Sequence, residues 1–214
     1  MVEKSPTTKR LFQLECIMKK IILGLIGPKF SGKTTLAKEL ESQGFTIISL
    51  ASPIKEMLHT LLYIQNCPED MIKRYLYGNL KEEPCPYLDG NSPRLAMQTL
   101  GTEWRNLISK ELWLNIWTRS VENTTNLNII CDDVRFIHEG NRIQSLGGKL
   151  IYIRRKGTTI GTHPSENEFL KLDPDLYIEN RTEVGSKLDG SEYEKHHLLD
   201  ELQNRYHSKY KEYL

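Results

Sequence analysis

Near the start of the chain, four residues have the types and the spacing of a phosphate-binding loop. Gly27, Gly32, Lys33 and Thr34 match the pattern G-x-x-x-x-G-K-[ST]. In such a loop the glycines let the backbone come close to a polyphosphate, and backbone N–H groups point at its oxygens. The Lys33 ammonium would lie along the β- and γ-phosphates, and the Thr34 hydroxyl would be a ligand of Mg²⁺. The spacing therefore predicts the binding of a polyphosphate together with Mg²⁺.

The flanking sequence has the order that this loop requires. The apolar run Ile21–Ile26 precedes the loop and predicts a strand, and residues 34–43 predict a helix that ends at Gly44. The first N–H groups of that helix and the positive end of its dipole would face the same anion. The alternative is a glycine-rich turn with a solvated Lys33, which does not explain why the glycines, the lysine and the hydroxyl all fall in register. The residues predicted to bind the phosphates of ATP are Gly27, Lys29, Ser31, Gly32, Lys33, Thr34 and Thr35.

A second group of charged residues follows the strand predicted at residues 127–131. Asp132 and Asp133 come directly after it, and carboxylate oxygens are ligands that Mg²⁺ prefers. Arg135 follows, and its planar guanidinium matches the geometry of phosphate oxygens. The alternative is an Asp–Arg pair on the surface at the end of a strand. We expect Thr34, Asp132 and Asp133 to hold Mg²⁺, directly or through water.

Two further arginines, Arg154 and Arg155, follow the strand predicted at residues 149–153. The polar, glycine-bearing segment after them predicts a mobile cover, which we place at residues 155–172. At the base of this cover the two guanidiniums could clamp ATP phosphates. Because phosphoryl transfer needs mainly positioning and charge neutralisation, the predicted catalytic residues are Lys33, Arg135, Arg154 and Arg155.

These residues meet at one edge if the strands pair in parallel. Strands are predicted at Ile21–Ile26 and at residues 45–50, 127–131, 149–153 and 176–178, with helical segments between them. The first strand, helix and second strand form a βαβ unit, which favours parallel pairing, and ligands of such sheets bind at the carboxyl ends of the strands. We interpret residues 52–117 as a mainly helical insertion, where a phosphate acceptor would bind. The predicted fold class is α/β.

The composition excludes several classes of protein. With 214 residues, 38% of them hydrophobic, the chain suits one α/β domain with an insertion. The 29 Lys and Arg residues balance the 28 Asp and Glu residues, so nothing in the net charge favours a nucleic-acid or membrane partner. No apolar run approaches the roughly 20 residues that span a bilayer, which predicts a soluble protein. Four scattered cysteines without a C-x-x-C pair argue against a zinc site or a disulfide and suit the reducing cytoplasm.

The N-terminal residues 1–17 lack the apolar core of a secretory signal. Met18 stands directly before two lysines and the first predicted strand, so it could be the biological start. We therefore expect a tail at residues 1–17 and one domain at residues 18–214.

Several short segments have the residues and the order of one enzyme family. RLAMQTLGTEW at residues 94–104, ELW at 111–113, CDDVRFIHE at 131–139 and THPSE at 162–166, together with ASPIKE at 51–56, resemble the deoxynucleoside monophosphate kinases of tailed bacteriophages. The resemblance covers most of the chain. It implies the three-layer P-loop kinase fold, with a five-stranded parallel sheet and helices on both faces. It also implies transfer of the γ-phosphoryl group of ATP to a deoxynucleoside monophosphate with Mg²⁺, in the cytoplasm, which is the host's if the source is viral.

The same resemblance implies which residues bind the acceptor. They are Ile54, Lys55, Arg94, Gln98, Gly101, Trp113, Asp133, Arg135 and Glu139, of which the last three would lie near the phosphates and sugar. Residues 63–93 do not align with the family, and in such enzymes that segment helps to select the base, so the accepted base is left open. The expected partner is a small molecule, and a homodimer is the default expectation for the oligomeric state.

Two other functions fit part of the pattern. Phosphomevalonate kinases of the animal type also have a D-x-R after a strand beside a phosphate loop and a P-[IL]-K-E turn, whereas the LGTEW and THPSE segments favour a nucleotide acceptor. A non-catalytic or GTPase-like binding module would share the loop. Against that module, the chain has no N-K-x-D motif for reading guanine, and three arginines stand where a second phosphate would need them.

Overall fold

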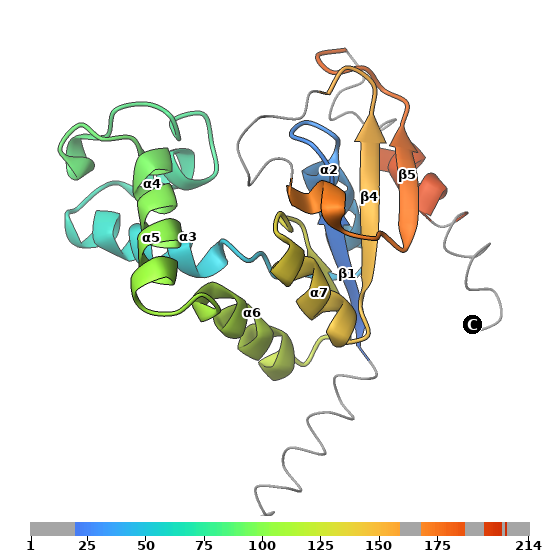
Figure 1. The fold of residues 1–214 in the computed structure, drawn as a ribbon. Helices are drawn as coiled ribbons and strands as arrows, with labels where there is room; N and C mark the ends of the chain where they lie inside the picture. Colours follow the sequence, from blue (N-terminus) through green and yellow to red (C-terminus); the bar gives the residue numbers. More distant parts are fainter. Residues whose placement is uncertain (1–19, 159–167, 187–194, 203, 205–214) are drawn as a thin grey trace, which may run out of the picture. The chain divides into compact units, whose positions relative to one another are not determined.

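The computed structural model describes residues 20–158, 168–186, 195–202 and 204 (Figure 1). The chain divides into two units, a first unit of Met1–Ser49 and Ser120–Leu214 and a second unit of Leu50–Arg119. The bounds of the second unit lie close to those of the insertion predicted at residues 52–117. The predicted N-terminal tail and the THPSE segment lie outside the described residues.

The first unit is built on one parallel sheet of five strands in the order β2-β3-β1-β4-β5. The strands are β1 (Ile21–Ile26), β2 (Thr46–Ile47), β3 (Asn128–Cys131), β4 (Lys149–Arg155) and β5 (Leu176–Asn180). Because every neighbouring pair is parallel, the carboxyl ends of all five strands lie at one edge. This confirms the predicted α/β fold with a five-stranded parallel sheet. It also explains the apolar run of β1, since a central strand covered on both faces is buried, as this one is after Ile21.

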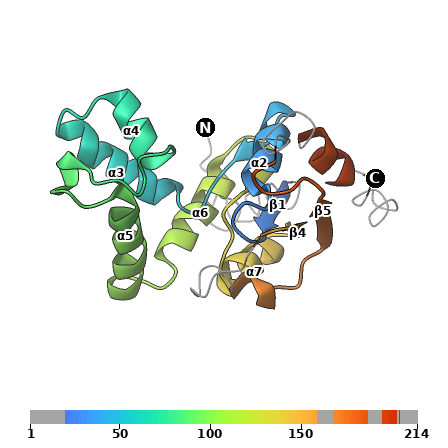
Figure 2. The ribbon, with the colours of Figure 1, turned by 90° about the horizontal axis from the view of Figure 1, so that it is seen from above.

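Helices cover both faces of this sheet (Figures 1 and 2). On one face, α2 (Lys33–Ser42) and the helical residues 195–202 pack on the strands. The buried helix residues of this core are Leu36, Ala37, Leu40, Leu198 and Leu202. On the other face, α7 (Ile137–Ser145) and the short 3₁₀ helix η2 (Glu168–Lys171) pack together. The close approach of α7 needs Gly140, where an added Cβ would lie 2.5 Å from Leu172 Cδ2.

The last residues of the predicted cover, 168–172, lie on the same face of the sheet as α7. Phe169 and Leu172 are buried, so residues 168–172 form part of the layer over the sheet rather than of a mobile segment. The physical reason is that the apolar side chains of Phe169 and Leu172 pack against a helix and a sheet, although the sequence before them is polar. Residues 159–167 of the predicted cover lie outside the described residues.

The second unit is helical. It contains α3 (Ser52–Ile64), α4 (Glu69–Leu76), the 3₁₀ helix η1 (Pro86–Leu88) and α5 (Pro93–Leu107), and α6 (Leu112–Asn123) begins in it. Its core is made of buried residues from α3, α4 and the loops that follow each of them, namely Leu58, Leu62, Cys67, Ile72, Tyr75, Leu76 and Cys85. No strand occurs among the residues described for this unit, in agreement with the mainly helical insertion that the sequence predicted.

One helix differs from its prediction. The spacing of Ile108, Leu112 and Ile116 predicts a single mainly buried helix over residues 104–121, but the chain ends α5 at Leu107 and starts α6 at Leu112. Ile108 is 62% exposed. Ser109 causes the break, because its hydroxyl accepts the N–H of Glu111 and its carbonyl accepts the N–H of Leu112, which replaces helical hydrogen bonds by a turn.

The cysteines that the structure describes behave as predicted. Cys67, Cys85 and Cys131 are buried and free, and no disulfide joins them. Within the described part of the chain, none of the helices combines the length and the apolar character that crossing a membrane requires.

Candidate active site

The loop between β1 and α2 has a backbone that requires its glycines. Gly27 has φ 141° and Gly32 has φ 104°, a region that residues with a side chain rarely enter. An added Cβ at Gly27 would also lie 2.4 Å from the carbonyl oxygen of Ile153. The two glycines of the pattern therefore sit where the loop turns against β4 and where it enters α2.

Some hydrogen-bonding groups of this loop have no partner among the described residues. At the N-terminus of α2 no side chain caps the helix and no acidic residue lies in its first turn, so the first N–H groups lack the partners that a cap would supply. Ser31 is fully buried, and its hydroxyl oxygen has no hydrogen-bond partner among the described residues. Helix N-termini and such loops bind phosphate groups, and the unpaired buried hydroxyl fits an anion bound inside the loop.

Lys33 lies at the centre of this group of donors. Its ammonium donates to the carbonyl oxygens of Gly27 and Pro28, each at 2.7 Å. The pKa of Lys33 is lowered to about 8, first by burial and then by the charge of Arg135, and the two aspartates Asp132 and Asp133 partly oppose both effects. The residues after β3 and the loop lysine thus share one electrostatic environment, as their places at the carboxyl edge predicted.

The two aspartates after β3 are held differently. Asp132 Oδ1 accepts a 2.6 Å hydrogen bond from Ser49 Oγ, which follows β2. Asp133 Oδ1 accepts a hydrogen bond of 3.5 Å from the Cys131 thiol. Sequence reasoning did not include Ser49, although a polar residue just beyond a strand at the ligand edge is the signal that could have found it.

The candidate metal ligands in the described part of the chain are few. Among the described residues, no group of three or more His, Cys, Asp or Glu side chains could hold a metal ion. Thr34 is exposed and both aspartates are partly exposed, so their oxygens can reach an ion that arrives with phosphate. This donor set fits Mg²⁺, which keeps several waters and takes one or two carboxylates together with substrate phosphates.

Glu139 holds the backbone that carries Arg135. Glu139 Oε2 accepts the N–H of Arg135 at 2.8 Å and the N–H of Phe136 at 3.0 Å, and so satisfies the start of α7 from its third residue. The pKa of Glu139 is raised from 4.5 to about 7, mainly by burial, after the opposing effect of the two backbone hydrogen bonds is included. The Arg135 side chain itself is exposed.

The arginines at the end of β4 have different surroundings. Arg154 is exposed, which suits the predicted contact with phosphate. Arg155 is 4% exposed, and its guanidinium donates to the carbonyl oxygens of Phe30, Thr182 and Glu183 and to the Thr182 hydroxyl. These contacts support the loop from inside the protein, a role different from the predicted clamp on phosphate. A contact between Arg155 and ATP stays a prediction.

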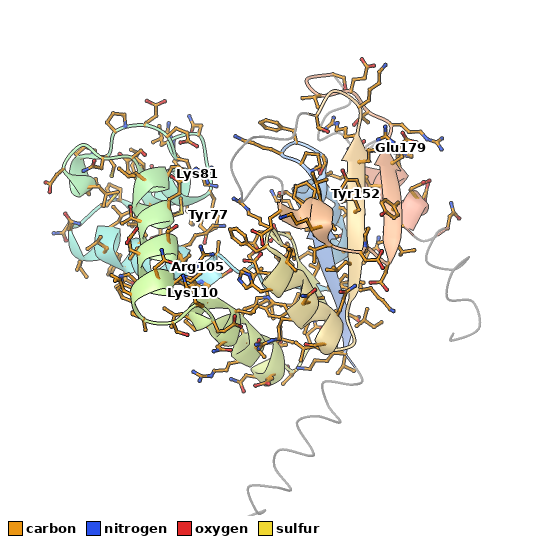
Figure 3. All side chains as sticks on the ribbon, in the orientation of Figure 1. Tyr77, Lys81, Arg105, Lys110, Tyr152 and Glu179 are labelled. Atoms are coloured by element: carbon orange, nitrogen blue, oxygen red, sulfur yellow. The ribbon has the colours of Figure 1, made fainter. Side chains whose placement is uncertain are left out.

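In the second unit, Lys55 and Arg94 both have partners that the sequence did not indicate. The Lys55 ammonium lies 4.8 Å from the centroid of the Tyr77 ring, and Arg94 Nε lies 3.0 Å from Glu82 Oε1. Gln98 is exposed on α5. In the view of Figure 3, three basic residues lie on the same side of this unit as Tyr77, namely Lys81, Arg105 and Lys110.

The tryptophan predicted to meet the acceptor is fixed by its neighbours. Trp113 is 8% exposed, and its indole N–H donates to the carbonyl oxygen of Gly101 at 2.9 Å. Its ring stacks on Trp104 with a centroid separation of 6.2 Å, and Trp104 is 40% exposed. At Gly101 an added Cβ would lie 3.2 Å from Ile54 Cδ1. The exposed member of this pair, Trp104, was not among the predicted site residues.

Comparisons with known proteins agree on one enzyme family. Residues 69–188, more than half of the chain, match the family described as deoxynucleotide monophosphate kinase. A protein of Acanthamoeba polyphaga mimivirus that bears the name "Putative deoxynucleotide monophosphate kinase" is 32% identical over 180 residues, which cover 76% of this chain and 90% of that protein. The crystal structure of TT1252 from Thermus thermophilus is similar over 86% of this chain and 97% of that one, at 14% identity and a TM-score of 0.43.

Proposed function

The chain belongs to the deoxynucleotide monophosphate kinase family, and on this premise we propose that it transfers the γ-phosphoryl group of ATP to the phosphate of a deoxynucleoside monophosphate. An oxygen of the acceptor phosphate attacks the γ-phosphorus, and the bond from that phosphorus to the bridging oxygen breaks, which yields a deoxynucleoside diphosphate and ADP. The observation that carries the proposal is the loop at residues 27–35, with an unpaired buried Ser31 hydroxyl and a lysine in the electrostatic environment of Arg135 and two aspartates.

The donor phosphates are bound by the loop. The Lys33 ammonium exchanges its two carbonyl acceptors for oxygens of the β- and γ-phosphates, because charged oxygens are the stronger acceptors. The Ser31 hydroxyl and the first N–H groups of α2 donate to the same phosphates. Arg135 and Arg154, both exposed at the carboxyl edge, neutralise charge on the group in transfer.

The donor set also supports a magnesium ion. Thr34, Asp132 and Asp133 would hold Mg²⁺, directly or through water. When bound, Mg²⁺ supplies neutralisation of charge on the β- and γ-phosphates. The bond from Ser49 to Asp132 keeps one of these carboxylates in place.

The second unit supplies the acceptor-binding residues in this proposal. Those that lie in it are Ile54, Lys55, Arg94, Gln98, Gly101 and Trp113. Lys55 and Arg94 bring positive charge for a monophosphate, since the partner of Arg94 is an exposed glutamate that a phosphate dianion can replace. Trp113 and Gly101 shape the aromatic surface for a base.

An acceptor screen tests the proposal. Purified protein is incubated with MgATP and, one at a time, the common deoxynucleoside monophosphates, the ribonucleoside monophosphates and phosphomevalonate, and ADP is measured. We expect ADP to form with one or more deoxynucleoside monophosphates, together with the matching diphosphate. Release of ADP at the same rate with and without every acceptor would contradict a kinase, and transfer to phosphomevalonate alone would contradict a nucleotide acceptor. Lys33→Ala is the control, because background activity from a contaminant would survive it.

A further inference from the structure

A buried polar network lies behind the phosphate-binding loop. Arg155, Asn180 and Thr182 are 4%, 1% and 2% exposed. Charged and polar side chains are rarely buried so completely unless their hydrogen bonds are satisfied. Arg155 and Asn180 end the strands β4 and β5, and Thr182 follows β5, so the network sits at the same edge of the sheet as the loop.

The Thr182 hydroxyl links the two other members. It donates to Asn180 Oδ1 at 2.7 Å and accepts from Arg155 Nη2 at 2.8 Å. Asn180 Oδ1 also accepts the N–H of Thr182 at 3.1 Å, which fixes which end of the amide faces Thr182. The amide nitrogen of Asn180 is thereby turned toward the loop.

Two carbonyl groups of the loop accept hydrogen bonds from this network. Asn180 Nδ2 donates to the carbonyl oxygen of Ser31 at 3.0 Å, and Arg155 Nη1 donates to the carbonyl oxygen of Phe30 at 2.9 Å. A trans peptide holds its C=O and the next N–H in opposite directions. Holding the Ser31 carbonyl toward Asn180 therefore turns the Gly32 N–H away from the network, toward the open side of the loop.

The loop needs such support because one of its residues is in an unfavourable conformation. Phe30 has φ 66°, in the left-handed region that residues with a large side chain avoid, and its side chain is 61% exposed. Burial of that side chain therefore does little to hold the backbone. The hydrogen bond from Arg155 acts on the Phe30 carbonyl itself.

We propose that Arg155, Asn180 and Thr182 are positioning residues that hold the Phe30–Ser31–Gly32 backbone in the conformation that binds the phosphates of ATP. The inference rests on the proposed function only in taking ATP as the ligand of the loop. It assigns Arg155 to the support of the loop and leaves the contact with phosphate to Arg135 and Arg154.

A pair of matched variants tests this. Thr182→Val keeps the shape of the side chain and removes the hydroxyl, whereas Thr182→Ser keeps the hydroxyl and removes the methyl group. Binding of MgATP to the full chain is measured by calorimetry without any acceptor. In Thr182→Val the hydroxyl that joins Arg155 to Asn180 is lost, and MgATP binding should weaken about tenfold, the effect of one hydrogen bond to a charged group. In Thr182→Ser the dissociation constant for MgATP should stay within about twofold of that of the unmodified protein.

Two further readouts separate positioning from general stability. Hydrogen exchange of the Gly32 amide in the ligand-free protein should become faster in Thr182→Val, while exchange of the β1 amides stays unchanged. In steady-state assays the KM for ATP should rise and the KM for the acceptor should not. If Thr182→Val does not fold, Arg155→Lys, which keeps the charge and loses the fork of donors, takes its place with the same expectations.

The outcomes distinguish this inference from the proposed function. Equal MgATP affinity of the two Thr182 variants, or weaker binding with unchanged exchange of the loop, overturns the positioning role even if the kinase activity is found. If the two variants differ in MgATP affinity as expected but the protein phosphorylates no acceptor, the positioning role is supported and the proposed function is contradicted. Absence of MgATP binding by the unmodified protein overturns both.

Discussion

Replacing Glu139 by glutamine should change how the stability of the protein depends on pH. The Glu139 carboxylate accepts two backbone N–H groups at the start of α7, and a glutamine oxygen can accept the same two, so the substitution removes the ionisable group and keeps its contacts. The pKa of Glu139 is raised from 4.5 to about 7, mainly by burial. The folded protein therefore binds this proton more tightly than the unfolded chain.

The sign and size of the effect follow from this shift. Between pH 4.5 and about 7 the folded state holds more protons than the unfolded state, so the stability of the unmodified protein falls as pH rises through that window. The full shift corresponds to about 3 kcal/mol at 1.36 kcal/mol per pKa unit. Because the side chain keeps some contact with water, we expect about 2–3 kcal/mol.

The assay is urea unfolding followed by circular dichroism at several pH values between about 5 and 8. The free energy of unfolding of Glu139→Gln minus that of the unmodified protein should rise with pH by the amount given above. Glu179→Gln, at an exposed position of β5 (Figure 3), is the control for what any such substitution does. A difference that stays constant with pH, or that falls as pH rises, would refute the assignment of a buried, protonated Glu139 to the folded state.

Three further substitutions test the site and the fold. Lys33→Ala should lower kcat/KM for phosphoryl transfer by about a thousandfold or more with an unchanged circular dichroism spectrum; near-normal activity would contradict its role. Arg94→Ala should raise the KM for the monophosphate about tenfold or more and leave the KM for ATP unchanged. Little stability should be lost, because the ion pair of Arg94 with Glu82 is largely exposed. A raised KM for ATP with an unchanged KM for the monophosphate would place Arg94 at the ATP side. Gly140→Ala should destabilise the protein by about 1–3 kcal/mol, because its Cβ would lie 2.5 Å from Leu172 Cδ2, and an unchanged urea midpoint would show that α7 does not pack so closely.

Part of the fold could be predicted because it depends on neighbours in the chain. The apolar run of β1 and the glycines at positions 27 and 32 are signals within a few residues of one another, and the five strands lie near where the apolar runs predicted them. The places of Asp132, Asp133 and Arg135 followed from one further rule, that the ends of parallel strands share an edge. The bounds of the second unit lie close to those of the insertion that the sequence predicted at residues 52–117.

Other features could not be read from the sequence because they depend on contacts between distant parts of the chain. Arg154 and Arg155 look alike in the sequence, but neighbours on a strand point to opposite faces of the sheet, and only the register of β4 against β5 decides which one is buried. Ile108 fits a helical stripe, yet the Ser109 turn leaves it exposed. Lys20 precedes β1 without any visible pattern and is buried, with its ammonium donating to the carbonyl oxygens of Val121 and Thr124.

The amino-acid sequence by itself determined the pattern of a phosphate-binding loop, the strands on either side of it and the family to which the chain is similar, because these depend on residue type and on short spacings. Only the tertiary structure decided that Glu139 supports the backbone of Arg135, and that Arg155, Asn180 and Thr182 support the loop from behind. A hydrogen bond depends on the distance between two atoms, and residues more than 100 positions apart, such as Phe30 and Arg155, come within that distance only after the sheet has formed.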